Sequence, residues 1–123
     1  YANANAIMTL HLAIYALAEI GNNDPLGKLS AARMADGEIQ VAVRGGPALI
    51  VQVNAGKLRV KQGISEHRRA KMVFADIESA GAVLRGELSS YAAIGRDLIE
   101  LGGYVPMLDN LNKLLSLVPR YLG

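Results

Sequence analysis

Few side chains in this sequence could act as a nucleophile or a general base, because its 123 residues include two histidines and no cysteine. His11 falls in an apolar stretch and His67 in a charged one, and no Gly-x-Ser-x-Gly motif presents a serine on a strand-to-helix turn. Ser-His and Cys-His catalysis therefore lack the residues they need. The lack of cysteine also excludes disulfides, zinc fingers and iron–sulfur ligation.

Three polar residues near the N-terminus, His11, Tyr15 and Glu19, are spaced to form one stripe on a helix. Metal sites usually take three or four ligands, and tyrosine is a poor one. We interpret the stripe as the polar edge of a buried helix and predict no metal and no cofactor. The pairs Gly45-Gly46 and Gly102-Gly103 match no phosphate-loop pattern, so we predict turns at both places.

A basic run, His67, Arg68, Arg69 and Lys71, has two interpretations. It is either a solvated loop or a patch that contacts anionic lipid headgroups or an acidic partner, where each basic residue near an anionic membrane contributes about 1 kcal/mol. Nucleic acid is not an expected partner. Basic residues exceed acidic ones by only 13 to 11, and the chain has no Trp and one Phe for base stacking.

The apolar spacing over residues 5–20 predicts an α-helix that ends at the breakers Gly21 to Pro25. Polar residues within this stretch argue against a membrane span, and the lack of Lys and Arg before Lys28 argues against a signal peptide. We expect a buried helix and, since cysteine is absent, a cytoplasmic location. A short helix is expected around Leu29–Met34.

The hydrophobic period then changes to two, which predicts strands over residues 38–44, 47–54, 57–61 and 70–75. Asp76 is the expected N-cap of a helix that runs to Arg85 and stops at Gly86. The remaining predicted elements are a short helix over residues 91–94 capped by Ser89 or Ser90, a strand over residues 97–101 closed by Gly102-Gly103, and a final amphipathic helix that begins near Pro106 and is limited by Pro119.

Helices thus fall at both ends of the chain and between the fourth and fifth strands, where all can cover one face of a sheet. We predict one α+β domain over residues 1–123, with a five-stranded, mostly antiparallel sheet covered on one face by helices.

Apolar residues on the helix that follows Asp76 and on the final helix either fill the core or leave a cavity beneath these helices. The sequence cannot separate the two, because a packed core and a lipid tunnel need the same residue types. The 13 glycines and the single Phe favour a cavity, because aromatic side chains fill volume best. The candidate lining residues are Met72, Phe74, Val83, Leu84, Met107, Leu108, Leu111 and Leu115.

Several segments resemble the sterol carrier protein type 2, or nonspecific lipid-transfer, family. They are Ala75-Asp76 through Gly86-Glu87-Leu88, then Leu98 to Gly102 ahead of a Leu-rich helix, and the hairpin from Ile39 to Val60. The resemblance covers residues 38–118. The chain departs from the family at Ser79 to Ala82, where the family is usually bulkier.

The resemblance implies a five-stranded sheet covered by helices, with an apolar tunnel that binds a fatty acyl, isoprenoid or sterol-like lipid. It also implies no catalytic residues, so we expect binding or transfer rather than enzyme activity. Two alternatives remain. The apolar faces could instead bury a partner, with strand edges or the first helix forming a homodimer, or the chain could be an auxiliary domain of a larger enzyme.

Overall fold

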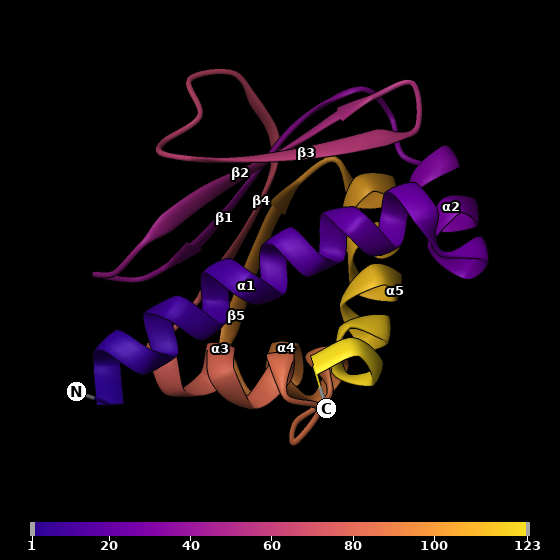
Figure 1. The fold of residues 1–123 in the computed structure, drawn as a ribbon. Coiled ribbons are helices and arrows are strands. Elements are labelled where there is room, and N and C mark those ends of the chain that lie inside the picture. Colours follow the sequence, from indigo (N-terminus) through magenta and orange to yellow (C-terminus); the bar gives the residue numbers. More distant parts are fainter. Residues whose placement is uncertain (1, 123) are drawn as a thin grey trace.

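The computed structural model describes residues 2–122, with side chains described for residue 8 and residues 10–119; Tyr1, Gly123 and the side chains of residues 1–7, 9 and 120–123 lie outside this description. The elements in chain order are α1 (Ala2–Asn23), α2 (Pro25–Ala32), β1 (Gly37–Val43), β2 (Ala48–Asn54), β3 (Lys57–Gln62), β4 (Arg68–Phe74), α3 (Ile77–Leu84), α4 (Ser90–Gly95), β5 (Ile99–Gly103) and α5 (Val105–Leu122) (Figure 1).

The strands form one five-stranded sheet in the order β3-β2-β1-β4-β5. Three neighbouring pairs are antiparallel, and β1 with β4 is parallel. The helices lie together on one side of this sheet (Figure 1). The predicted α+β fold with a mostly antiparallel sheet is therefore confirmed.

The sheet has an apolar face because alternate residues of each strand point the same way. Ile39 of β1 pairs with Val51 of β2, which pairs with Val60 of β3, and all three are buried under the helices. Met72 and Phe74 of β4 extend the same face, with no measurable exposure. Helices α1, α3 and α5 pack against this apolar face of the sheet and form the core with it.

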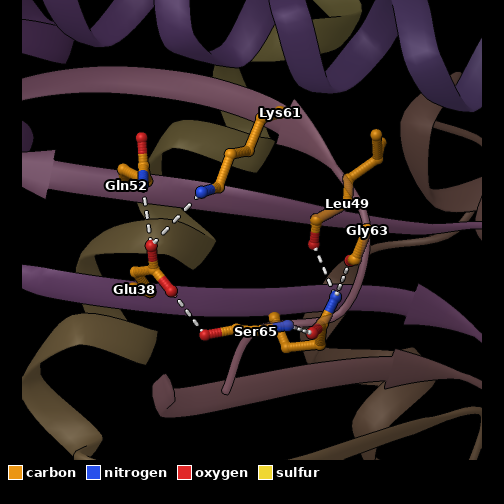
Figure 2. A network of polar contacts seen from close by, with 7 residues as sticks. Glu38, Leu49, Gln52, Lys61, Gly63 and Ser65 are labelled. Atoms are coloured by element: carbon orange, nitrogen blue, oxygen red, sulfur yellow. Dashed lines mark hydrogen bonds and ion pairs between the residues drawn. The ribbon is translucent and has the colours of Figure 1, made fainter. Parts of the chain in front are cut away.

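The opposite face of the sheet carries a polar network instead of a helix (Figure 2). Gln40 is buried there, and its amide donates to the carbonyls of Leu49 and Gly63, both at 2.9 Å, while its oxygen accepts from the Ser65 backbone N–H at 2.6 Å. Glu38 accepts from the Ser65 hydroxyl at 2.6 Å and from the Gln52 amide at 2.7 Å. These two bonds, the Ser65 one foremost, hold the pKa of Glu38 below its ordinary value. The network fastens the β3–β4 loop over the sheet.

The C-terminal end of α1 is fastened to the edge strand β3 by one side chain. The Asn22 amide donates to the Leu58 carbonyl at 2.9 Å, and its oxygen accepts from the Leu58 backbone N–H at 2.7 Å. The amide thus pairs with a strand edge that would otherwise be open. This fixes where α1 crosses the sheet.

Several sequence predictions about element ends were wrong: the short helix expected around Leu29–Met34 is α2, Pro25–Ala32, and the ends of the fifth strand and of the last helix also differ. Gly102 and Gly103 do not close the fifth strand but belong to it, pairing with Lys71 and Ala70 of β4. The strand starts later than predicted because Asp97 adopts a left-handed backbone conformation (φ 59°) before it. Pro119 does not end the last helix, which continues for three more residues to Leu122.

Candidate functional site

A pocket of about 330 Å³ opens between the α3–α4 segment and the C-terminal half of α5. Val83 of α3, Leu88 of the connecting loop, and Leu115 and Pro119 of α5 supply apolar walls. The remaining lining residues are Gly86, Ser89, Ser90, Tyr91 and Ser116. An apolar hollow edged by a few polar groups is the usual form of a small-molecule site.

Helix α3 is positioned by caps at both ends. The Asp76 side chain accepts from the Ser79 backbone N–H at 2.7 Å, and this bond holds the pKa of the Asp76 carboxyl below its ordinary value. At the other end, the backbone N–H groups of Glu87 and Leu88 both bond to the Ala82 carbonyl, at 2.9 and 3.2 Å. The caps set the angle at which Val83 enters the pocket wall.

Gly86 brings α3 and α5 together at the pocket. Its φ of +79° is in the left-handed region, which glycine adopts without the steric cost of a side chain. A Cβ at this position would lie 3.0 Å from the Cβ of Pro119 and 3.1 Å from its Cγ. Both observations call for glycine where α3 approaches Pro119 of α5.

The rim of the pocket lies on α4. The Ser89 hydroxyl accepts from the Ala92 backbone N–H at 3.0 Å and so caps this helix. Tyr91 is 63% exposed and lies on the pocket wall, although it is a large aromatic residue. Leu88 is partly buried against the core. Leu88 and Tyr91 thus line the pocket from the same side.

Helix α5 forms the opposite wall and buries two asparagines next to its leucine stripe. Asn110 is 7% exposed and Asn112 is 3% exposed. The Asn110 amide donates to the Pro106 carbonyl at 2.9 Å, but the buried Oδ1 atoms of both asparagines have no hydrogen-bond partner among the described residues. Buried polar atoms are nearly always paired, so these two call for an explanation.

Of the eight predicted lining residues, Val83 and Leu115 lie on this pocket. The other six are buried in the common core and are not among the residues that line it: Met72, Phe74, Leu84, Met107, Leu108 and Leu111. Sequence reasoning missed Leu88 and Tyr91, which fall in a loop and a short helix where no hydrophobic period exists to select them. Gly86 and Pro119 were recognised as helix-ending signals but not as parts of one wall.

The two polar clusters singled out in the sequence lie elsewhere. On α1, Tyr15 and Glu19 are exposed and His11 is partly buried. In the part of the chain that is described, no three His, Cys, Asp or Glu side chains gather as a metal site would require. Among residues 2–122, no helix is long and apolar enough to cross a membrane.

The basic run is only partly available to an external anion. Arg69 donates to the Asp36 carbonyl at 2.8 Å and lies 4.7 Å from the centre of the Tyr104 ring. Lys71 pairs with Glu100 at 2.7 Å, which contributes most to holding the pKa of Glu100 below its ordinary value. Arg68 and His67 are exposed.

Two larger hollows lie at the surface. One, of about 500 Å³, lies between α1 and α2 and includes Glu19 and Asp24 in its wall. The other, of about 680 Å³, lies at the end of the sheet, where charged Asp36, Lys57 and Arg59 contribute to the wall. Charged walls suit an apolar ligand less well than the α3–α5 pocket does.

No family model and no curated protein sequence matches this chain. Solved structures do. The sterol carrier protein domain 2 of Helicoverpa armigera is 18% identical over 91% of this chain and 89% of its own, with a TM-score of 0.71. Palmitated SCP2L2 of Aedes aegypti is 22% identical, with 84% and 90% covered and a TM-score of 0.65. UbiJ-SCP2, a ubiquinone synthesis protein, is 17% identical, with 85% of each chain covered and a TM-score of 0.64. At these identities the likeness shows the fold.

Proposed function

We propose that this chain, a domain with the fold of sterol carrier protein 2, binds or transfers the apolar part of a fatty acyl, isoprenoid or sterol-like lipid and carries no catalytic residues. The pocket between α3–α4 and α5 carries this proposal, because it lies between helices and its lining includes the aliphatic side chains of Val83, Leu88 and Leu115. The neighbour from Aedes aegypti that is described as palmitated supports a single acyl chain as the ligand. We also propose that the domain works in the cytoplasm.

The driving force would be desolvation. Each methylene group moved from water into an apolar site contributes about 0.8 kcal/mol. The pocket volume of about 330 Å³ is at the lower end of the usual range of ligand pockets, roughly 300–1,000 Å³. A long chain would therefore reach past Val83 and Leu115 toward the six buried lining candidates, with α5 moving outward as the gate, which a terminal helix can do without breaking the sheet.

The test is palmitate binding by the delipidated full chain, measured by isothermal titration calorimetry and by the rise in melting temperature. Leu88→Trp places a larger ring on the pocket wall and should weaken binding at least about tenfold, which corresponds to about 1.4 kcal/mol. Leu29→Trp is the matched control, since Leu29 is 57% exposed on α2, away from the pocket. It should bind palmitate like the parent protein.

The proposal fails if solvent extraction of the purified protein yields no lipid and palmitate leaves the melting temperature unchanged. It also fails if Leu88→Trp and Leu29→Trp bind palmitate equally well, because the ligand would then lie elsewhere. In a separate vesicle transfer assay, charge reversal of the exposed Arg68 tests contact with an anionic membrane. If Arg68 makes this contact, the variant should take up palmitate more slowly from vesicles containing phosphatidylserine, while its affinity for palmitate in solution stays unchanged.

A second candidate function is association through α1. Met8, Leu12 and Tyr15 are 63%, 60% and 46% exposed, and their spacing of four and three places them on one face of the helix. Leu26 and Leu29 of α2 are also exposed. A second copy seated on this stripe would make a homodimer, and Leu12→Glu should then halve the mass measured by light scattering. If light scattering gives the mass of a monomer for the parent protein itself, the homodimer is ruled out.

The UbiJ-SCP2 neighbour keeps the auxiliary-domain alternative open, since that protein is described by a role in ubiquinone synthesis.

A further inference from the structure

The Asn112 side chain is the most unusual feature of the helix that walls the pocket. It is 3% exposed, and its buried Oδ1 has no hydrogen-bond partner in the described part of the protein. An amide oxygen in such a place loses its hydration and gains nothing in return. A ligand that donates a hydrogen bond would satisfy it.

Helical geometry places Asn112 on the pocket side of α5. At about 100° per residue, its position around the helix axis is within about 60° of Leu115, Ser116 and Pro119. Those three residues line the pocket. Asn112 is not itself among the lining residues but lies one turn closer to the helix N-terminus, on the same helix face and next to the wall that Leu115 and Ser116 form.

Asn110 provides the contrast. It lies about 200° around the axis from Asn112, on the opposite edge of the buried stripe. Its amide already donates to the Pro106 carbonyl at 2.9 Å, and its Oδ1 also lacks a partner among the described residues. The two asparagines therefore share a chemistry but not a position, and only Asn112 lies on the helix face that carries the pocket residues of α5.

The backbone of the same helix supplies a second candidate acceptor. In a regular helix the Leu115 carbonyl would accept from the backbone N–H of residue 119, but residue 119 is proline and has none. The hydroxyl of Ser116, the other polar group nearby, already donates to the Lys113 carbonyl at 2.7 Å. The pocket side of α5 thus offers acceptors rather than donors.

We infer that Asn112 is the specificity-determining residue of this pocket and selects a single-chain lipid with a hydroxyl group, whose O–H donates to the Asn112 Oδ1 inside the protein. The inference rests on the proposed function and adds the chemistry of the buried group. A primary long-chain alcohol meets these needs, because it combines one donor with a chain thin enough for a small pocket. A carboxylate, which only accepts, does not satisfy this oxygen.

The test compares 1-tetradecanol with 1-methoxytetradecane, which differs by the loss of the donor. Both are delivered from cyclodextrin to the delipidated full chain, and binding is followed by calorimetry. The parent protein should bind the alcohol about tenfold more tightly, the ratio expected for one neutral hydrogen bond in a buried site. Asn112→Leu should remove this preference while keeping its affinity for the ether within about twofold, whereas the matched control Asn110→Leu should retain the preference.

The outcomes separate the two proposals. If the parent protein binds both probes equally well, the inference is overturned and lipid binding stands. If it binds neither probe, the inference is overturned, and the palmitate measurement then decides whether the proposed function stands. A preference that survives in Asn112→Leu also overturns the inference. Should that variant not fold, Asn112→Ala removes the same acceptor without adding volume and is read in the same way.

Discussion

Helices α1 and α5 pack on the same core yet depart from the inside–outside rule in opposite ways. On α1, Met8 and Leu12 place large apolar side chains in water, at 63% and 60% exposure. On α5, Asn110 and Asn112 place amides in the core, at 7% and 3% exposure. The two helices contact each other, so both departures occur within one packed layer of helices.

The difference indicates two kinds of contact beyond the folded chain. Exposed apolar groups in a row favour association with another apolar surface, because removing them from water is favourable. Buried polar groups without partners favour a guest that brings a hydrogen bond, because the penalty of their burial is then offset. The outer side of α1 is therefore the candidate for a macromolecular contact, and the inner side of α5 is the candidate for a small ligand.

The largest expected effect separates the buried and exposed leucines of the two helices. Leu111 of α5 is 1% exposed, and Leu111→Ala should lower the free energy of unfolding by about 2–5 kcal/mol through lost burial and a cavity. Leu12→Ala on α1 should change it by less than about 0.5 kcal/mol. Urea unfolding followed by circular dichroism measures both. If Leu12→Ala instead lowers the free energy of unfolding strongly, and more so at higher protein concentration, then the exposed face of α1 with Met8, Leu12 and Tyr15 is already buried between copies of the chain.

The leucine stripe of α5 illustrates what the sequence predicts well. Periodicity identified Leu108, Leu111 and Leu115 as inward-facing, and all three are buried. It could not distinguish Leu115, on the pocket, from Leu111, in the closed core. That distinction depends on what α3 and α4 leave unfilled, which is a property of packing between elements.

Tertiary contact also explains the errors at glycine and proline. A Cβ on Gly103 would overlap the Arg69 backbone, so this glycine is needed where β5 approaches β4, in addition to its left-handed φ of +94°. Pro119 faces Gly86 across the helix pair. Local rules assign each residue one meaning, whereas these positions are determined by a neighbour far away in the chain.

A smaller effect is expected where α1 is anchored. Asn22→Ala removes both hydrogen bonds to the Leu58 backbone, at 2.9 and 2.7 Å, and should lower the free energy of unfolding by about 1–2 kcal/mol. Asn23→Ala is the matched control, because Asn23 is exposed and bonds only to Glu19 on its own helix. Its effect should stay below about 0.5 kcal/mol. Equal losses in the two variants, measured by urea unfolding, would show that β3 does not hold the helix.

The smallest expected effect concerns the ionisation of Asp76, which caps α3. Helix α3 forms the pocket together with α5, so this prediction belongs to the α5 side of the molecule. The Asp76 carboxyl caps α3 by accepting a hydrogen bond from the Ser79 backbone N–H. This bond, followed by a bond to the Ser79 side chain, lowers the pKa of the Asp76 carboxyl from the ordinary 3.8. A lowered pKa in the folded state means that the stabilisation is fully present above about pH 4 and is lost as the pH falls through the lower folded value.

Asp76→Asn keeps a capping oxygen without the titration, since Asn and Asp cap helices about equally well. The urea midpoint of the parent protein should therefore fall more steeply below pH 4 than that of Asp76→Asn, while the two agree closely near pH 7. Glu38, Glu87 and Glu100 also have lowered pKa values, but they titrate in both proteins, so the difference between the two curves isolates Asp76. Parallel curves would mean that the charge at Asp76 adds nothing to the stability of α3 beyond the capping hydrogen bond that Asn also makes.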